Sequence, residues 1–579
     1  MSRDYTDEKN VLILLSLLKQ YRIKTIIASP GTTNATFVRS VQVDPYFKVY
    51  SAVDERSAAY MACGLSAESG EVVVLSCTGA TASRNYLPGL TEAYYRKLPI
   101  LAITSTRDKS RYGHLEDQVI DRTILPKDVA KFRVHLPNIK DTDDEWECRI
   151  LICAAILELS RNGGGPVHIN LTTSYNRSYS TKALPSVSSI ARHNVLDDFP
   201  SIPKVRIGIF IGSHRQFSCM ENKIIDDFCE SNNAVVFCDH TSGYKGKFGV
   251  RYLLPLMQIE VNYAELMPEL LIHIGEISGF YHPFMHNPKE VWRVSEDGEI
   301  RDTFKRLRHI FEMPENHFFK KYTTGKKIKT TYFDAWQVIV EDLESRLPEI
   351  PFSNLWVAKT LSCQIPKGSN LHFGILNSLS SWNYFKVCNS VNCNSNVGGY
   401  GIDGCVSSLL GASLVDPQKL YFGFVGDLAF FYDMNSIGNR HLPKNLRLLV
   451  VNNGKGIEFK IKNNPATQFG EEIDEFIAAA GHFGNKSKTL IKDYASSLGF
   501  KYLSASTKEE FIKHQHEFLD NELKGQPVLF EVFTCDEEED LAQKKFKAIE
   551  KSFKGSTKRL VREFIGDGSV NKLNKIFKR

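Results

Sequence analysis

Two oxygen-bearing side chains stand directly after apolar segments in the C-terminal third of the sequence. Asp427 follows the apolar run 420–425, and Asn453 follows the run 446–451 after one further asparagine. If these runs are neighbouring parallel strands, both side chains reach one sheet edge, together with the main-chain carbonyl of Lys455. Mg²⁺ prefers such oxygen ligands and commonly completes its coordination with phosphate oxygens and water. The spacing predicts a Mg²⁺ site that also holds a diphosphate.

Glycines surround these predicted ligands and would let the main chain approach a diphosphate closely. They are Gly426, Gly454 and Gly456. A Gly-Asp pair after a strand is common in loops, so the pair by itself is weak evidence, but its combination with Asn452-Asn453 is more specific. A helical pattern that begins near Asp433 would add main-chain N–H groups that favour an anion.

An Asp54-Glu55 pair opens a helical pattern after the apolar run 49–52. For an isolated pair, the commoner interpretation is a helix cap or a favourable contact with the helix dipole. A carboxylate held in an apolar pocket can instead have a raised pKa and exchange protons near neutral pH. Taken alone, the pair therefore favours a helix cap, with a catalytic role for Glu55 as the alternative.

The elements that must position these residues are apolar runs of strand length that alternate with helical patterns. In the first segment the expected strands cover 25–28, 49–52, 72–76, 100–104 and 167–171. In the later segments they cover 205–211, 235–238, 270–274, 371–375, 420–425, 446–451 and 528–532. This alternation predicts an α/β fold of mostly parallel sheets flanked by helices, with ligands bound at the carboxyl ends of the strands.

Three segments of this kind predict three domains. We expect them at 1–185, 200–325 and 331–540, followed by a basic tail at 541–579. The stretch 184–203 is predicted to be a linker, and the charged stretch 301–330 a helix with a connector. For the tail, a solvated helical appendage is the commoner interpretation, with contact to nucleic acid or membrane as the alternative.

Charge and cysteine usage argue against several protein classes. The net charge of +5 arises from 72 basic and 67 acidic residues that are well mixed, so it argues neither for nor against a nucleic-acid partner, and we expect none. None of the 12 cysteines forms a C-x-x-C pair, which argues against a zinc site and favours reduced, largely buried thiols. No apolar run has the length of a membrane helix, and the N-terminus is unlike a secretory signal. We therefore expect a cytoplasmic protein without a membrane partner.

The arrangement around Asp427 and Asn453 resembles the diphosphate-binding signature of thiamine diphosphate enzymes, with a slightly shorter spacing. The resemblance implies thiamine diphosphate and Mg²⁺ as cofactors. In that family a Glu at the place of Glu55 donates a hydrogen bond to the aminopyrimidine ring, which prepares the ring to take a proton from the thiazolium carbon. Glu55 is thus implied to be catalytic.

Further motifs extend the resemblance over nearly the whole chain up to the tail. In order, they lie at 29–31, 54–59, 85–88 with Glu92, Arg107, 165–170, 377–379, 401–404 and 426–428. Together they are similar to those of the menaquinone-pathway 2-succinyl-5-enolpyruvyl-6-hydroxy-3-cyclohexene-1-carboxylate synthases. This implies a pyrimidine-binding, a central and a diphosphate-binding domain. It also implies an active site between the first domain of one subunit and the third of another, and so at least a homodimer.

The resemblance also implies roles for individual residues. Gln118 matches an active-site glutamine near the reacting centre, and Ile402 matches the apolar residue that holds the cofactor bent. The implied cofactor contacts are Gly31, Thr78, Asn377, Ser378, Ile402, Gly426, Asp427, Leu428 and Asn453. Taken alone, a glutamine is ordinarily a surface residue and an isoleucine a core residue, so only the surrounding motifs favour these roles.

The sequence departs from the family pattern at positions suited to substrate carboxylates. Thr32 and Thr33 stand where the family has Ser-Arg, and Trp382 and Val397 stand where it has arginines. Arginine binds carboxylates through paired hydrogen bonds, and each lost contact should cost on the order of 1.5–3 kcal/mol. The predicted substrate residues are therefore Thr32, Thr33, Arg107 and Trp382, and the flat face of Trp382 suits a sugar ring or a small aliphatic 2-oxo acid.

Together these features predict a decarboxylating carboligase, in which a 2-oxo acid such as pyruvate loses CO₂ and is joined to an acceptor carbonyl. The alternatives are a simple decarboxylase, the menaquinone-pathway synthase itself, and a catalytically silent cofactor-binding protein. Intact Glu55, Asp427 and Asn453 argue against the silent protein. A nicotinamide dehydrogenase would need a G-x-G-x-x-G motif that opens a helix, and the glycine-rich loops do not supply one.

Overall fold

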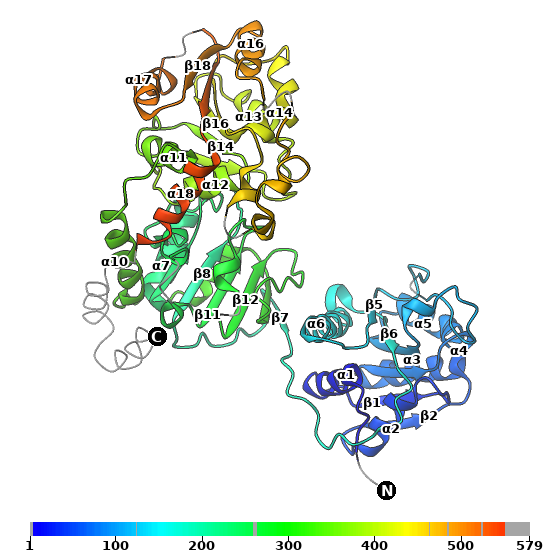
Figure 1. The fold of residues 1–579 in the computed structure, drawn as a ribbon. Helices are drawn as coiled ribbons and strands as arrows, with labels where there is room; N and C mark the ends of the chain where they lie inside the picture. The colour runs from blue at the N-terminus through cyan, green and yellow to red at the C-terminus, as the bar shows by residue number, and fades with distance from the viewer. Residues whose placement is uncertain are drawn as a thin grey trace. The chain divides into compact units, whose positions relative to one another are not determined.

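The chain forms two compact units in a computed structural model that describes residues 4–122, 124–258, 263–285, 287–461, 464–482, 486–522 and 525–549. The first unit combines residues up to Asp197 with the segment Gly298–Glu312, and the second combines Asp198–Asp297 with the residues from Met313 onward (Figure 1). No helix in the described ranges is long and apolar enough to cross a membrane. All 12 cysteines are described, and all are free thiols.

A six-stranded parallel sheet forms the core of the first unit, with the order β2-β1-β3-β4-β6-β5. Its strands are β1 (Thr25–Ala28), β2 (Lys48–Ser51), β3 (Val73–Cys77), β4 (Ile100–Thr106), β5 (Phe132–Leu136) and β6 (Val167–Thr172). The helices are α1 (Lys9–Gln20), α2 (Ala35–Val43), α3 (Glu55–Ser69), α4 (Thr81–Asn85), α5 (Leu87–Tyr95) and α6 (Thr142–Glu158), with 3-10 turns η1 (Lys109–Arg111) and η2 (Arg161–Gly163). Strands β3, β4 and β6 are buried along their whole length, as a parallel sheet covered on both faces requires.

Helix α3 shows how local sequence fixes the elements at the sheet edge. Asp54 caps its start, because the carboxylate accepts hydrogen bonds from the main-chain N–H groups of Arg56 and Ser57 at 2.8 and 3.2 Å. Gly70 ends the helix with a φ of 70°, a conformation that glycine adopts without strain. The cap therefore sets the position of Glu55, the first residue of the helix.

The second parallel sheet has the order β10-β9-β8-β11-β12 within the second unit. These strands are β8 (Ile207–Ile211), β9 (Ala234–Phe237), β10 (Gly249–Val250), β11 (Leu270–Ile274) and β12 (Glu290–Ser295). They are accompanied by α7 (Cys219–Asn232), α8 (Leu253–Leu256), η3 (Ala264–Leu266) and η4 (His282–Phe284). A reciprocal capping box between Ser218 and Glu221 starts α7.

Two further strands belong to the first unit and pair with each other in parallel. They are β7 (Ala191–Asn194) and β13 (Leu307–Glu312), with His309 beside Ala191. The predicted linker 184–203 thus contains a strand, and 301–330 contains β13 as well as the helix α9 (Glu315–Tyr322). The expected helix within 301–330 is confirmed by α9, but the two strands were not expected, because both carry charged and polar residues and lack an apolar run.

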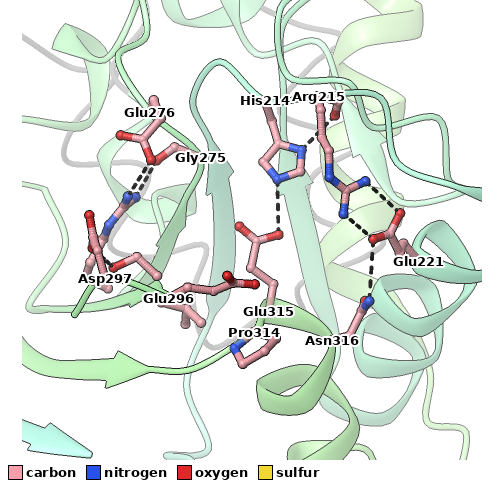
Figure 2. A pocket seen from close by; sticks show the side chains of 13 residues that line it. His214, Arg215, Glu221, Gly275, Glu276, Glu296, Asp297, Pro314, Glu315 and Asn316 are labelled. Carbon is pink, nitrogen blue, oxygen red and sulfur yellow. Dashed lines mark hydrogen bonds and ion pairs between the residues drawn. The ribbon is translucent and has the colours of Figure 1, made fainter. Parts of the chain in front are cut away.

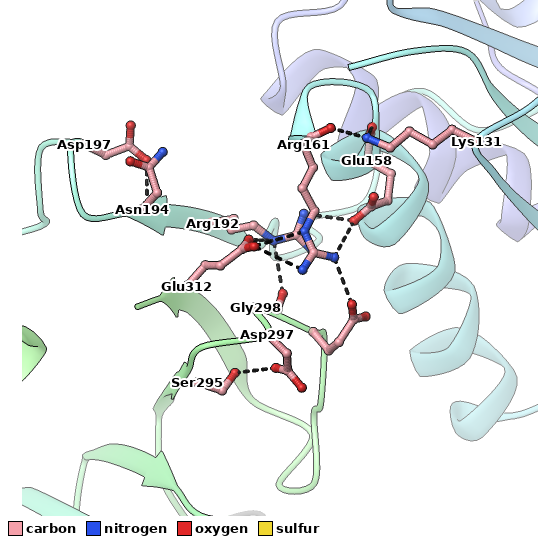
Figure 3. A network of polar contacts seen from close by, with 11 residues as sticks. Lys131, Glu158, Arg161, Arg192, Asn194, Asp197, Ser295, Asp297, Gly298 and Glu312 are labelled. Carbon is pink, nitrogen blue, oxygen red and sulfur yellow. Dashed lines mark hydrogen bonds and ion pairs between the residues drawn. The ribbon is translucent and has the colours of Figure 1, made fainter. Parts of the chain in front are cut away.

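Two arginines hold these segments of the first unit together (Figure 3). Arg161 pairs with the carboxylates of Glu158, Glu299 and Glu312 at 3.1, 2.9 and 3.2 Å. Arg192 reaches Glu158 at 3.1 Å and Glu312 at 3.7 Å. Shared, partly buried pairs of this kind are screened less by solvent than isolated surface pairs. The network explains why the segment 298–312 joins the first unit.

The third parallel sheet lies in the second unit and has the order β15-β14-β16-β17-β19-β18. Its strands are β14 (Asn370–Phe373), β15 (Asn392–Ser395), β16 (Tyr421–Gly426), β17 (Leu446–Asn452), β18 (Lys501–Ala505) and β19 (Val528–Phe533). The helices and turns are α10 (Thr331–Ser345), α11 (Asn354–Leu361), α12 (Asn377–Asn383), α13 (Cys405–Ser413), α14 (Asp427–Asp433), η5 (Met434–Gly438), η6 (Ile457–Lys460), η7 (Pro465–Ile473), α16 (Leu490–Ser497), α17 (Lys508–Phe518) and α18 (Asp536–Phe546). The three sheets with their flanking helices confirm the predicted α/β fold.

The last described helix, α18, packs against α11 within the second unit (red in Figure 1). Its buried residues include Glu539 and Phe546, and the Phe546 ring lies 4.8 Å from the Tyr384 ring, centroid to centroid. The start of the predicted tail, 541–549, is therefore part of the packed unit rather than a solvated appendage. The remainder of the predicted tail lies outside the described residues.

Candidate active site

The predicted metal ligands come together at the carboxyl edge of the third sheet. Strand β16 pairs in parallel with β17, so that Gly426 lies beside Val451. Asp427 begins α14 directly after β16, and Asn453 follows the last residue of β17. Neighbouring parallel strands end at the same edge, and this juxtaposition is the one that the sequence predicts. Helix α14 begins at Asp427, earlier than the expected start near Asp433.

Asp427 is a buried carboxylate, with 2% of its surface exposed. One oxygen accepts a hydrogen bond from the main-chain N–H of Leu428, and the other accepts one from Gly454, both at 2.8 Å. Burial raises the pKa of Asp427 to about 7, although these hydrogen bonds oppose the shift. No cationic side chain pairs with the carboxylate within the described part of the chain, so a bound cation would relieve a real desolvation penalty.

The two adjacent asparagines have different surroundings. Asn452 donates from Nδ2 to Glu531 Oε1 at 2.7 Å, inside the sheet. The Oδ1 atom of Asn453 is buried and has no hydrogen-bond partner in the described structure. An unsatisfied buried acceptor is uncommon, because it loses its interaction with water. Asn453 and Asp427 therefore present oxygen donors that fit a divalent cation.

The loop after β17 has the conformation that a close approach to a ligand requires. Gly454 has a φ of 79°, which disfavours any other residue. A side chain at Gly426 would meet no atom within 4 Å, so there is open space beside this residue. The side chain of Lys455 is held by Asp474 at 2.7 Å and Asp536 at 3.0 Å, which leaves its main-chain carbonyl as the predicted metal ligand.

The other predicted cofactor contacts of this unit stand at neighbouring loops. Asn377 and Ser378 begin α12 after β14 and are 8% and 4% exposed. Ile402 precedes α13 and packs as a partly buried side chain on the core that lies beneath α13 and β16. The roles of these residues toward a cofactor stay predictions, and their placement after strands of one sheet agrees with them.

Trp382 lies in the protein core. Its ring is 0% exposed and packs on the rings of Phe373 and Phe424, with centroid distances of 5.2 and 4.2 Å. The predicted flat face for a substrate is therefore not accessible in this structure. The expectation is corrected because α12 turns this position toward the apolar face of the sheet, where an aromatic ring fills space.

In the first unit, Glu55 stands at the carboxyl end of β2 and accepts a hydrogen bond at Oε2 from Asn85 Nδ2 at 3.2 Å. Asn85 is the last residue of α4, which follows β3. The side chain of Glu55 is only partly buried within this unit. The contact orients one carboxylate oxygen and leaves the other available to a ligand.

Three predicted residues meet at the ends of β1 and β3. A side-chain carbon added to Gly31 would lie 2.5 Å from Cβ of Thr78, so only glycine permits this approach. The hydroxyl groups of Thr33 and Thr78 share a short hydrogen bond. Thr33 Oγ1 also donates to the Ser105 carbonyl at 3.2 Å and is 3% exposed, whereas Thr32 is exposed. Burial of the Thr33 hydroxyl among protein groups corrects its predicted role in contacting the substrate.

Gln118 and Arg107 lie beside the same edge. Gln118 is exposed and has a φ of 58°. Its main-chain carbonyl oxygen would lie 3.4 Å from a side-chain carbon added at Gly79. Arg107 donates to Glu116 Oε2 and to the Tyr175 hydroxyl, both at 3.2 Å. Its guanidinium is thus already engaged by protein groups.

Arg122, which no sequence motif identifies, is 2% exposed and donates from Nη2 to the Ser105 carbonyl at 3.3 Å. Burial lowers its pKa. The Nη1 atom of Arg122 would lie 3.4 Å from a side-chain carbon added at Gly79. Arg122 is therefore next to the loop that contains Thr78 and Gly79. A single arginine in a polar stretch carries no sequence signal of burial, so its place beside the site could not be predicted.

A separate pocket of about 350 Å³ lies at the carboxyl edge of the second parallel sheet (Figure 2). Its cations already have protein partners. His214 Nε2 lies 3.4 Å from Glu315, and Arg215 Nη1 donates to Glu221 at 3.0 Å. Arg293 Nη1 donates to the Gly275 carbonyl at 2.6 Å. None of the predicted site residues lines this pocket.

Comparison with known proteins agrees with the cofactor chemistry of these residues. Residues 11–125 match the family model described as "Thiamine pyrophosphate enzyme, N-terminal TPP binding domain". Thiamine pyrophosphate and thiamine diphosphate are the same molecule. The matched segment contains Gly31, Glu55 and Thr78.

The curated relatives cover almost the whole chain. A 2-succinyl-5-enolpyruvyl-6-hydroxy-3-cyclohexene-1-carboxylate synthase of Bacteroides fragilis is 30% identical over 547 residues, which are 92% of this chain and 97% of the relative. Enzymes of the same name from Bacteroides thetaiotaomicron and Flavobacterium johnsoniae are 30% and 26% identical, over 92% and 90% of this chain and 96% of each relative. The chain therefore belongs to the family of the 2-succinyl-5-enolpyruvyl-6-hydroxy-3-cyclohexene-1-carboxylate synthases, and it is a thiamine pyrophosphate-dependent enzyme.

Proposed function

We propose that this enzyme uses thiamine pyrophosphate and Mg²⁺ to decarboxylate a 2-oxo acid and to join the remaining fragment to an acceptor carbonyl. The observation that carries the proposal is a pair of oxygen-bearing side chains at one sheet edge. Asp427 is buried without a cationic partner in the described residues, and Asn453 Oδ1 is buried without a hydrogen bond. A divalent cation would satisfy both groups, because Mg²⁺ prefers oxygen ligands.

The residues of the chain take separate roles in this proposal. When bound, thiamine pyrophosphate would supply the carbon nucleophile and the electron sink that decarboxylation of a 2-oxo acid needs. Asp427, Asn453 and the Lys455 carbonyl would hold the metal. Glu55 holds a proton at Oε1, while Asn85 fixes Oε2 by its hydrogen bond of 3.2 Å.

We further propose that the functional assembly is at least a homodimer, in which Glu55 of one subunit and the metal ligands of another serve one cofactor. The family resemblance supports this arrangement. The partner in the reaction is a small 2-oxo acid, and the composition gives no reason to add a nucleic acid.

Two alternatives fit the same cofactor residues. A simple decarboxylase would protonate the intermediate fragment instead of joining it to an acceptor. The synthase named for the relatives would make 2-succinyl-5-enolpyruvyl-6-hydroxy-3-cyclohexene-1-carboxylate. Thr33, Trp382 and Val397 support a different substrate, because each stands where the family pattern has an arginine and none of them offers its guanidinium.

The test is turnover of ¹³C-labelled pyruvate with a panel of acceptor carbonyl compounds, followed by mass spectrometry. Wild type should release CO₂ and form a coupled product only with thiamine pyrophosphate and Mg²⁺. Glu55→Gln should bind the cofactor but lose turnover by about 10²–10⁴-fold, the usual contribution of a general acid–base group.

Lys97→Met, an exchange at an exposed residue outside the site, is the control. Unchanged turnover in Glu55→Gln would refute its role. CO₂ release without any coupled product would favour the decarboxylase, and detection of the product named for the relatives would favour the synthase.

A further inference from the structure

A cavity of about 560 Å³ lies beside the predicted cofactor loops of the second unit. Three of its lining residues come from those loops. Leu376 immediately precedes Asn377, Tyr400 stands two residues before Ile402, and Glu458 stands three residues after Lys455. The volume is within the usual range for small-molecule sites. The cavity therefore has the size and the position of a substrate chamber next to the cofactor.

Glu458 brings a carboxylate to this cavity from the short turn η6. Burial raises its pKa, and the positive charge of Lys547 opposes the rise. The carboxylate makes no side-chain hydrogen bond and no ion pair with any described residue. The side chain is partly buried, and a ligand hydroxyl that enters the cavity can donate a hydrogen bond to its carboxylate.

Lys547 brings the opposite charge from the end of α18. Burial lowers its pKa, and the charge of Glu458 opposes the fall. Its main chain is anchored, because Gln258 Nε2 donates to the Phe546 carbonyl at 3.2 Å. Like Glu458, its side chain has no ion pair within 4.0 Å among the described residues.

Both charged groups thus line the cavity without forming an ion pair with each other. Other titratable groups that line it are His282, Tyr384 and Tyr400. Most of the remaining lining is apolar, as at Leu253 and Phe280. A ligand that contacts both groups would need an anionic end for the Lys547 ammonium and a hydrogen-bonding end for the Glu458 carboxylate.

We propose that this cavity holds the acceptor of the reaction, and that the acceptor is a small hydroxylated acid with one carboxylate and the carbonyl group to which the fragment is joined. Lys547 pairs with the carboxylate of the acceptor, and Glu458 accepts a hydrogen bond from its hydroxyl group. The identification as an acceptor site rests on the proposed function. A dicarboxylate is disfavoured, because its second carboxylate would face Glu458.

Calorimetric titration of the full chain, with and without thiamine pyrophosphate and Mg²⁺, tests the proposal with three probes. Glycerate has one carboxylate and two hydroxyl groups, propionate lacks the hydroxyl groups, and malate has a second carboxylate. Wild type should bind glycerate about tenfold more tightly than propionate or malate, as the gain or loss of a charge-assisted hydrogen bond implies.

Variants at the two charged residues should change different parts of this discrimination. Lys547→Met should weaken glycerate binding about tenfold, and Lys547→Arg should restore it. Glu458→Gln should reduce the preference for glycerate over propionate and strengthen malate binding. Thermal melting checks that each variant is folded.

Matched controls come from exposed residues of the same elements or their neighbours. Lys544→Met removes a lysine of α18 that is 54% exposed and paired with Asp540, and Glu472→Gln changes an exposed residue of η7. Both should bind all three probes like wild type.

The results separate the cavity from the cofactor chemistry. Wild-type affinity for glycerate in Lys547→Met, or no discrimination between the probes in wild type, would overturn the proposal even if pyruvate is decarboxylated. Glycerate discrimination that depends on Lys547 and Glu458, in a protein without thiamine pyrophosphate-dependent CO₂ release, would support the binding site and refute the proposed function.

Discussion

At the scale of single residues, the adjacent asparagines 452 and 453 show how a strand end selects a ligand. Successive side chains of a strand point to opposite faces of the sheet. Asn452 still belongs to β17 and is bonded to Glu531 of β19, the neighbouring strand. Asn453 lies beyond the last ladder position, and its Oδ1 is left without a partner in the described structure. The prediction of Asn453 as the ligand is consistent with this division of roles.

Asn453→Ala should weaken the Mg²⁺-dependent binding of thiamine pyrophosphate on the order of tenfold or more, because one oxygen ligand of the metal is lost. The measurement is the apparent cofactor affinity at several Mg²⁺ concentrations. Asn521→Ala, at an exposed loop position, is the matched control. An unchanged Mg²⁺ dependence in Asn453→Ala would place the metal elsewhere.

At the scale of elements, the charged residues of α18 did not indicate that this helix packs within the second unit. Its first turn carries Asp536, Glu537, Glu538 and Glu539, and its last turn carries Lys544 and Lys545, a distribution that suits the helix dipole. Glu539 is nevertheless 1% exposed and accepts hydrogen bonds from the Asn354 N–H at 2.8 Å and the Thr534 hydroxyl at 2.9 Å. The helix is thus tied to the start of α11 and to the end of β19.

Glu539→Gln should change the pH dependence of stability. Burial raises the pKa of Glu539 from 4.5 to about 7 in the folded protein. The stability that its proton contributes is therefore fully present below about pH 4.5 and is lost as the pH rises through about 7. Glutamine needs no proton, so the variant should be more stable than wild type by about 1–3 kcal/mol at pH 8, with a smaller difference at pH 5.

Thermal or urea unfolding at the two pH values measures this difference. Glu537→Gln, at an exposed position of the same turn, should show no such pH-dependent gain. Equal effects of Glu539→Gln at pH 5 and pH 8 would show that the carboxyl group does not titrate in the folded state as expected.

At the scale of the whole molecule, the residues of the proposed site belong to different compact units. Glu55 is in the first unit, and Asp427 and Asn453 are in the second. Each group stands at the carboxyl edge of its own parallel sheet, where ligands bind in folds of this type. The proposed homodimer would let one cofactor use both edges, with the two groups supplied by different copies of the chain.

Mixing two inactive variants tests this arrangement. If sites are shared, a dimer of Glu55→Gln with Asp427→Ala contains one site with both changes and one unchanged site. Random exchange in a symmetric dimer should then restore about a quarter of wild-type turnover. The measurement is turnover after co-expression, with mass spectrometry to verify that mixed dimers form. Mixed dimers without activity would show that each chain serves its own cofactor.

Local signals in the amino-acid sequence were enough to predict the α/β class, most strand positions and the candidate cofactor residues at the strand ends. Apolar runs mark buried strands, and the residues just beyond neighbouring parallel strands share one edge of the sheet. Asp427 and Asn453 are predicted as site residues in this way, because each follows such a run closely, whereas Glu55 is favoured over a helix cap only by the resemblance to thiamine diphosphate enzymes.

The burial of polar and aromatic residues, and what they face, became known only from the packed fold. Trp382 and Thr33 are packed among protein groups, β7 and β13 form without apolar runs, and Lys547 lines the same cavity as Glu458. Burial depends on contacts between segments far apart in the chain, and a residue's type and near neighbours do not encode those contacts.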